Sequence, residues 1–518
     1  MSPDPPKPAG LPFATPWPGL PRRRLAALAR AAVYAAVIAA MIVPVVQFQA
    51  GLAKRIRQAE AYERRAAAGT LPPGVARPSG TKGAVIRWGR PIRRFWQGVN
   101  IYRTREEAAA EAARGDRPDD GRLPVGLHPN MPFTVMVLTP FAYLPPLTAA
   151  LIYNVLKVAV IVASVLLAVA VANHDGGRMP DWVVAAALLF GLRLVVADVQ
   201  HGNTNSFVLG GVVLHLWMYR RGHDFWAGVP LAAAICLKMT PAMFLLYWLY
   251  QRNGRLLAGA LAALLVFAVL VPGAALGPSR YADYTGAWLE NLVIPGLVKG
   301  SWYPTHINQS LPGVAARYLM DAREGDIYWD PEQDPAYTTE RHGWINLVSM
   351  PDPAARWVVR ALQTAVVALM AWAIGWRKLP RDDGRRGLHY AIVLLGMMIL
   401  NQRTWDHHAA VLLPAYVAVW YAIAFGRLPG PGRVRAWALG LALAAGALVW
   451  AKAGELFRLA ARLAGEPKGA GELWGNRFMA YGPMLLHFLL MLAACVLLAR
   501  AMRKQADPYA DRRQKLTE

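Results

Sequence analysis

Eight polar or aromatic residues, Asn401 to His408, separate two long apolar runs at 387–400 and 409–425. They read Asn-Gln-Arg-Thr-Trp-Asp-His-His, so one short turn holds a carboxylate, a guanidinium, two imidazoles, an indole and two amides. A plain turn uses Gly, Pro, Ser or Asn. Groups of the kind found here are costly to desolvate at a membrane surface and usually mark function. The turn therefore predicts acid–base or anion-binding chemistry, the alternative being a hydrated loop with an interfacial tryptophan.

The side chains of this turn suit different roles. Asp406 is a candidate general base, because a carboxylate can accept the proton of a hydroxyl. Arg403, His407 and His408 are candidate ligands for a phosphate group, and Trp405 is a candidate face for a sugar ring. Adjacent histidines on a helix point about 100° apart. No His, Asp or Glu spacing elsewhere completes a site, so no metal is expected.

A second polar turn, at 198–205, also joins two apolar runs. Asp198 is the other candidate base. The amides of Gln200, Asn203 and Asn205 both donate and accept hydrogen bonds, as sugar hydroxyls do. Asparagine is also a good N-cap residue, so helix capping is an alternative role that is compatible with sugar binding.

Lys238 lies between two apolar stretches in the sequence Leu237-Lys238-Met239-Thr240-Pro241. A lysine in such a place must snorkel to the surface, pair with a charge, or hold an anion. The proline breaks the helix and frees backbone groups nearby. A compact ammonium suits a phosphate group, so Lys238 is predicted to bind phosphate, with snorkelling as the alternative.

Two more clusters complete the set of polar segments. One contains His128 and Asn130, and the other contains Asn308 and Gln309. All four are candidate ligands for sugar or acceptor hydroxyls. Aromatic residues stand just before the second cluster, and their faces suit sugar rings and the lipid headgroup layer equally.

These clusters need helices to position them, and the chain is rich in apolar runs. Of its 518 residues 55% are hydrophobic, and the mean hydropathy is +0.26. Many runs are long enough to cross a bilayer, which predicts an all-α integral membrane protein, a polytopic helix bundle. We expect about twelve spans, near 25–47, 145–171, 181–198, 204–219, 225–237, 239–251, 255–275, 355–376, 387–400, 408–425, 434–451 and 477–500.

The basic residues predict how these spans are oriented. Short arginine-bearing loops stand at one end of the spans, which the positive-inside rule places in the cytoplasm. Cytoplasmic tails at 1–24 and 501–518 then flank a membrane domain at 25–500, with outer segments at about 48–144 and 277–354. The first outer segment is itself basic, but segments longer than about 60 residues largely escape the rule. All five polar clusters fall on the outer face, where we expect them to line one cavity.

Several function classes are excluded by composition and motifs. The formal net charge is +24, but the basic residues stand beside apolar spans, which fits contact with membrane lipids and not with nucleic acid. There is no Walker A motif, no GxGxxG after a strand and no GxSxG, and no cofactor is expected. An enzyme of this shape would need its donor delivered within the membrane, for example as a lipid-linked phosphate.

The polar clusters resemble, in order, the motifs of the polyprenyl-phosphate-dependent membrane glycosyltransferases of family 87, which includes bacterial mannosyltransferases. The patterns concerned are Gly-x-Asp/Asn-x-Tyr, Tyr-Pro-Pro with a Pro-rich run, Gly-Gln-x-Asn, Lys-x-x-Pro, Asn-Gln-Ser and Ser/Thr-Trp-x-His-His. The resemblance covers about residues 95–425, and the matching segments are Gly98–Tyr102, His128–Pro145, Gly202–Asn205, Lys238–Pro241, Asn308–Ser310 and Thr404–His408.

This resemblance implies a C-type glycosyltransferase fold in the bacterial inner membrane, with its active site on the periplasmic side. It implies transfer of a hexose such as mannose from a polyprenyl-phosphate sugar to a lipid or glycan acceptor. A carboxylate would deprotonate the acceptor hydroxyl. Lys238, Arg403 and the two adjacent histidines would stabilise the leaving phosphate.

One departure from the family pattern concerns the base. The family usually carries an Asp shortly before its Gly-x-Asp/Asn-x-Tyr turn, and the expected place falls near Ala84, where there is no carboxylate. Either Asp198, Asp406 or Glu106 takes the role, or the activity is lost. We rank Asp198 ahead of Asp406, because cations beside Asp406 in the sequence would lower its basicity.

A transporter or flippase of lipid-linked sugars is the alternative from another class. It would favour internal inverted repeats and charged residues near the bilayer midplane. The chain has no obvious repeat, and its polar clusters stand at the ends of spans, which favours an enzyme.

Overall fold

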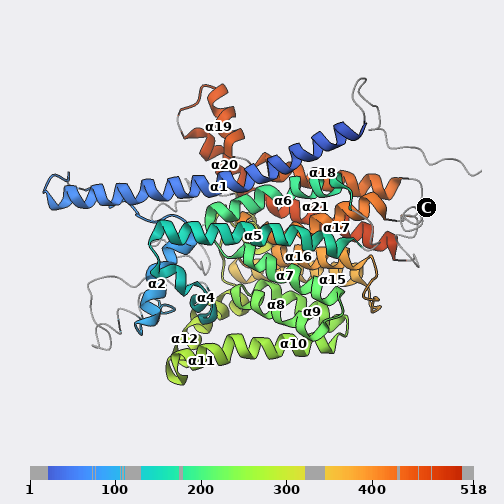
Figure 1. Cartoon of the computed structure of the whole chain (residues 1–518), viewed down its shortest axis with the longest axis horizontal. Helices are drawn as coiled ribbons and strands as arrows, with labels where there is room; N and C mark the ends of the chain where they lie inside the picture. The colour runs from blue at the N-terminus through green and yellow to red at the C-terminus, as the bar shows by residue number, and fades with distance from the viewer. Residues whose placement is uncertain are drawn as a thin grey trace, which may run out of the picture.

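The computed structural model is a bundle of α-helices (Figure 1) and describes residues 22–72, 74–75, 77–104, 107, 110, 130–173, 179–320, 345–426, 428, 432–452, 454–467 and 469–503. These ranges contain no β-strand, and the expected all-α membrane fold is confirmed. Eight helical segments of the described chain are long and apolar enough to cross a membrane. They are Ala35–Ala67 of α1 (Arg22–Ala67), α5 (Pro146–Ala172), α6 (Asp181–His201), the continuous α10 (Gly254–Leu264), η2 (Leu265–Leu270) and α11 (Val271–Leu276), α15 (Asp352–Ile374), η4 (Asp406–Leu412) with α17 (Leu413–Phe425), α18 (Arg433–Ala451) and α21 (Pro483–Met502).

The number of long spans is smaller than the twelve expected, because several apolar helices are short. Four expected spans are the short helices α7 (Asn205–Arg220), α8 (Asp224–Leu237), α9 (Met243–Tyr250) and α16 (Arg386–Leu400), and α4 (Pro132–Tyr143) is a further short apolar helix. The pair of spans expected at 225–237 and 239–251 is α8, a single turn η1 (Thr240–Ala242) and α9 (Met243–Tyr250). Pro241 lies in η1, and its missing N–H and fixed φ interrupt the helix.

Helix α1 is much longer than the span expected at 25–47. Its 46 residues end at Ala67, which corresponds to roughly 69 Å of helix. The sequence after residue 47 is rich in Ala, Arg, Glu and Gln, which favour helix, and no proline occurs between residues 45 and 71. Figure 1 shows α1 lying along the whole bundle and projecting beyond it at the end where α2 (Ala84–Trp96) lies.

The centre of the bundle is formed by α16 and α17, whose residues are almost all buried. A helix that is apolar on every side must be enclosed by other helices. Neighbours of this pair include α5, α6, α15 and α21, and α18 packs along α21 outside them. On the other side α8 packs between α7 (Asn205–Arg220) and α10.

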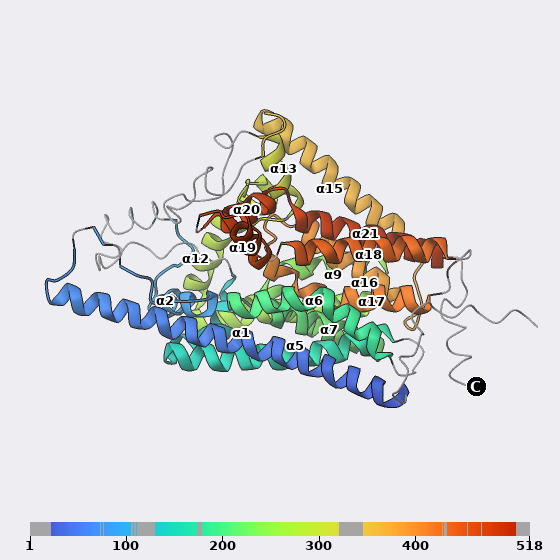
Figure 2. The ribbon, with the colours of Figure 1, turned by 90° about the horizontal axis from the view of Figure 1, so that it is seen from above.

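One end of the bundle collects the polar turns. Helices α6, α8 and α16 end there, and α2, α4 and α12 (Pro278–Trp288) lie together at the same end (Figures 1 and 2). The remaining helical segments are short: η3 (Leu289–Lys299), α13 (Leu311–Leu319), α19 (Gly454–Leu463) and α20 (Ala470–Ala480).

Candidate functional site

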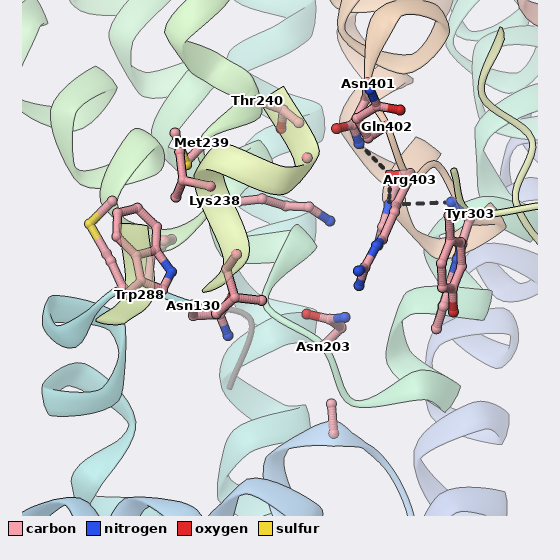
Figure 3. A pocket seen from close by; sticks show the side chains of 18 of the residues that line it. Asn130, Asn203, Lys238, Met239, Thr240, Trp288, Tyr303, Asn401, Gln402 and Arg403 are labelled. Atoms are coloured by element: carbon pink, nitrogen blue, oxygen red, sulfur yellow. Dashed lines mark hydrogen bonds between the residues drawn. The ribbon is translucent and has the colours of Figure 1, made fainter. Parts of the chain in front are cut away.

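A cavity of about 500 Å³ opens at this polar end (Figure 3). Four of the five polar clusters contribute to its lining, and α2, the end of α8, α12, η3 and the segment after η3 supply most of the rest. The residues that matter below are Ala84, Arg87, Asn130, His201, Asn203, Lys238, Trp288, Leu292, Val293, Leu297, Tyr303, Asn401, Gln402, Arg403, Trp405 and His408.

Lys238 enters the cavity because α8 stops one residue before it. Its backbone is extended, with φ −162° and ψ 127°, and η1 turns the chain away directly afterwards. The Nζ atom donates a hydrogen bond to Oδ1 of Asn205 at 2.8 Å. Burial lowers the pKa of the Lys238 ammonium to about 7, although the Asp198 carboxylate acts to raise it. An anion placed beside this lysine would restore the favourable charge balance.

Arg403 points into the same space as Lys238 from the opposite wall, and the amide of Asn203 lies beside both (Figure 3). The guanidinium lies over the ring of Tyr303, with Cζ 4.5 Å from the ring centroid. Two cations that converge on one space are an arrangement suited to a phosphate group.

Asn308 and Gln309 hold the 401–405 turn in place from behind. Asn308 donates to the carbonyls of Tyr303 at 2.8 Å and Gln402 at 2.9 Å, and its Oδ1 accepts from the backbone N–H of Thr404 at 2.9 Å. The backbone N–H of Gln309 donates to the Thr404 carbonyl at 2.7 Å. Both side chains are fully buried and neither lines the cavity, although a role in sugar binding was predicted for them.

Asp198 also lies outside the cavity lining, in a fully buried ion pair. Nζ of Lys157 on α5 is 2.7 Å from Oδ2, and neither side chain is exposed. Oδ2 also accepts from the backbone N–H of Ser206 at 3.1 Å and from its hydroxyl at 2.6 Å, and Oδ1 accepts from Nδ2 of Asn205 at 2.9 Å. Both carboxylate oxygens therefore have partners inside the protein, three on Oδ2 and one on Oδ1.

Asn205 connects this ion pair to the cavity. Because its Nδ2 donates to Asp198, its Oδ1 must face the other way, where it accepts from Lys238. The buried chain Lys157–Asp198–Asn205–Lys238 therefore sets both the orientation of the amide and the position of the ammonium.

Asp406 has a different environment, although it too is paired with a lysine. Its Oδ2 contacts Nζ of Lys452, which follows α18. The Lys452 side chain is 2% exposed, whereas that of Asp406 is 32% exposed, and neither lines the cavity. Both carboxylates predicted as bases thus face lysines instead of the cavity.

The histidines and Trp405 form a packed aromatic group beside the cations. The ring of Trp405 is parallel to that of His408, with centroids 6.0 Å apart, and His201 stacks on His407 at 3.8 Å. His201, Trp405 and His408 line the cavity. His407 does not, but Nδ2 of Asn203 lies 3.2 Å from its Nε2 and is thereby held at the cavity wall.

The other predicted ligands are divided between the cavity and its surroundings. Asn130 lines the cavity, and its backbone carbonyl accepts from the hydroxyl of Tyr102 at 2.9 Å. Gln200 is exposed and donates to Oε1 of Gln47 on α1 at 3.2 Å, away from the cavity. His128 and Glu106 lie outside the residues that the structure describes.

Ala84, the place where the resemblance implies an acidic residue, lies in the cavity wall. The backbone N–H of Val85 donates to the carbonyl of Gly202 at 3.1 Å, which docks the start of α2 on the 198–205 turn. Ala84 is thereby buried among the lining residues. No Asp or Glu belongs to the lining in the described part of the chain.

Several residues of the site were not singled out from the sequence. Lys157 is the one charged residue in the 27 residues of α5, and a lone charge inside an apolar span is a signal for a buried partner. Arg87 stands among other arginines, Trp288 is one of 19 tryptophans, and His201 is one of several polar residues in the 198–205 turn. None of the three therefore gave such a signal. Their place in the cavity follows from how α2, α12 and α6 meet.

The fold and the site define the class of this protein. It is an all-helical, multi-pass membrane protein whose polar turns converge on a cavity lined by cations. A family profile described as "Glycosyltransferase family 87" matches residues 130–401, more than half of the chain. The chain therefore belongs to glycosyltransferase family 87, as its motifs indicated.

The chain is also similar to a protein of Mycobacterium tuberculosis (strain ATCC 25618 / H37Rv), named polyprenol-phosphate-mannose-dependent alpha-(1-2)-phosphatidylinositol mannoside mannosyltransferase. The two are 27% identical over 314 residues, which is 57% of this chain and 63% of the relative. The match therefore spans less than two thirds of the relative's length. No solved structure matches the chain.

Proposed function

We propose that this chain is a membrane hexosyltransferase that moves a hexose such as mannose from a polyprenyl-phosphate sugar to a lipid or glycan acceptor. The observation that carries the proposal is the convergence of Lys238 and Arg403 on one cavity with no acidic residue in its described lining. Two cations that converge on one cavity suit the phosphate of the donor. Membership of family 87 and the donor named in the similar mycobacterial protein support the same class of substrate.

The walls of the cavity suit the other parts of such a donor. Trp288, Tyr303 and Trp405 offer aromatic faces for the sugar, and the amides of Asn130 and Asn203 match its hydroxyls. Leu297 lines the cavity and is 63% exposed, so an apolar outer surface adjoins the cavity. A prenyl chain can lie there in the bilayer while its phosphate reaches the cations.

In the proposed reaction the acceptor oxygen bonds to the anomeric carbon of the sugar. The bond from that carbon to the phosphate oxygen breaks, and the phosphate leaves with the electron pair, stabilised by Lys238 and Arg403. A base takes the proton of the acceptor hydroxyl. In the described lining the candidate bases are the imidazoles of His201 and His408. We assign Asp198 and Asp406 to positioning roles, because both are ion-paired outside the lining.

We place transfer on the extracytoplasmic face of the bacterial inner membrane. The bundle end opposite the cavity carries the arginine-rich short loops, including Arg220, Arg221 and Arg433. The positive-inside rule assigns that end to the cytoplasm.

The test is radiolabel transfer by the purified protein in lipid vesicles, with polyprenyl-phosphate sugars offered one at a time. Lys238→Ala removes the charge and is expected to raise the donor KM, by about 10- to 150-fold for a lost charge-assisted contact of about 1.5–3 kcal/mol. Lys238→Arg keeps the charge and should lose much less. Lys378→Ala, at the opposite end, is the matched control and should behave as the parent.

The same assay is repeated over a range of pH, and the donor KM is measured at each value. Because the pKa of Lys238 is lowered to about 7, its amine loses its charge as the pH rises through 7, and the parent's donor KM should then rise. Lys238→Arg should be flat over the same range, because its guanidinium stays charged. Equal KM values for Lys238→Ala and the parent would contradict the phosphate site. Movement of donor across the vesicles without a glycosidic product would support a transporter instead.

A further inference from the structure

A second cavity lies at the opposite end of the bundle from Lys238. Its volume is about 640 Å³, and it is enclosed by the C-terminal end of α15, the N-terminal end of α16 and the C-terminal end of α21. The far end of α16 leads into Asn401 of the first cavity, so the two are separated by roughly 22 Å of helix. Figure 2 shows α15 and α21 converging toward this end.

The lining of this second cavity is strongly basic. It includes Arg377, Arg385, His389, Arg500 and Arg503, and no acidic residue lines it in the described chain. Arg385 is balanced by Asp383, whose Oδ1 accepts from its Nε at 2.8 Å. The other three arginines make no ion pair with any described residue.

Two buried nitrogen atoms in this lining also lack a hydrogen-bond partner among the described residues. They are Nδ1 of His389, a side chain that is 3% exposed, and Nη1 of Arg500. A buried polar atom without a partner carries a free-energy cost that an incoming acceptor relieves. The uncompensated guanidinium groups, including the unpartnered N–H of Arg500, together call for an anion with several oxygens.

The surroundings of the cavity favour an anion that belongs to a lipid. The guanidinium of Arg500 lies 4.0 Å from the ring centroid of Trp372, which is 53% exposed, and Trp376 nearby is 67% exposed. Exposed tryptophans at the end of a span are typical of the headgroup layer. Basic pockets between spans at a cytoplasmic membrane surface are suited to anionic headgroups.

We infer that the arginine cavity at the ends of α15, α16 and α21 binds the phosphate group of an anionic membrane lipid, in the leaflet opposite the proposed transfer site. The phosphate lies between Arg377, Arg500 and Arg503, and its acyl chains lie along the exposed apolar face of α15. Free phosphate presents the same oxygen atoms as a lipid phosphate. The experiment must therefore distinguish binding of an anionic lipid from binding of inorganic phosphate.

The experiment is native mass spectrometry of the full-length protein, released from detergent after incubation with phosphatidylglycerol, phosphatidylcholine or inorganic phosphate. The parent is expected to retain phosphatidylglycerol in preference to phosphatidylcholine. The double variant Arg377→Gln/Arg500→Gln should bind phosphatidylglycerol at least about tenfold more weakly, because it loses two charge-assisted contacts. Arg221→Gln/Arg433→Gln removes two charges from the same end and should retain the lipid as the parent does.

Thermal unfolding in phosphatidylcholine nanodiscs controls for folding. Equal midpoints for the parent and both double variants would show that a lost lipid reflects the site and not damage. Equal retention of the two lipids by the parent, or undiminished retention by Arg377→Gln/Arg500→Gln, would overturn the inference. So would displacement of phosphatidylglycerol by equimolar inorganic phosphate, which would indicate a site for the free anion.

Discussion

The regions around Asp198 and Asp406 contain the same pair of charges in two different environments. Asp198 and Lys157 are both completely buried, and Asn205 and Ser206 donate three further hydrogen bonds to the carboxylate. Asp406 is one-third exposed, and only its partner Lys452 is buried. The first pair belongs to a buried hydrogen-bonded chain. The second pair joins a buried lysine to a partly exposed carboxylate.

The difference shows why residue type alone does not identify a base. A carboxylate inside a membrane protein needs a cation or several donors, because its desolvation is otherwise too costly. Asp198 meets this requirement with a lysine and three hydrogen bonds from inside the protein, and it does not line the cavity. What it contributes instead is the orientation of Asn205, which presents an oxygen to Lys238 at the cavity.

The largest expected effect is on stability, from Lys157→Met. This variant leaves Asp198 charged and buried without a cation, which should cost about 3–5 kcal/mol of unfolding free energy. Unfolding in mixed micelles with increasing SDS measures the loss. The double variant Lys157→Met/Asp198→Asn leaves no unpaired charge and should recover most of it. If the double variant is as unstable as the single one, the pair does not have the energetic role assigned to it.

The next largest effect separates positioning from catalysis at Asp198. The double variant Lys157→Met/Asp198→Asn leaves neither partner of the pair charged and no longer forces the amide of Asn205 into one orientation, so the donor KM should rise about tenfold while kcat changes less. Asn205→Ala removes the same contact to Lys238 without touching the ion pair, and should raise the KM similarly. A base would respond differently: kcat would fall by about 10²–10⁴-fold at an unchanged KM. Initial rates over a range of donor concentrations distinguish the two.

The smallest effect is expected for Asp406→Asn. Because Asp406 is partly exposed, its ion pair should contribute about 1 kcal/mol, or a factor of about five in the ratio of folded to unfolded protein. Transfer should stay close to the parent rate, and Lys452→Met should resemble it in the same unfolding and transfer assays. A loss of kcat of the size expected for a base would return Asp406 to the catalytic role that the sequence suggested.

The sequence by itself determined the class of this protein. Long apolar runs can be satisfied in lipid only by helices, so the all-α bundle was predictable, and the order of short polar motifs pointed to family 87. Lys238, Arg403, Trp405 and His408 could also be singled out, because charged and aromatic groups at the ends of spans are few and conspicuous.

Tertiary structure alone decided which polar groups are available to a substrate. Asp198 and Lys157 are 41 residues apart, and Asn308 and Gln402 are 94 apart, so their contacts appear only when distant helices meet. Asn203 and Asn308 have identical amides, but Asn203 lines the cavity, whereas Asn308 is fully buried and is bonded to the 401–405 turn. A hydrogen-bonding group has a fixed capacity, and folding determines whether the protein or a ligand fills it.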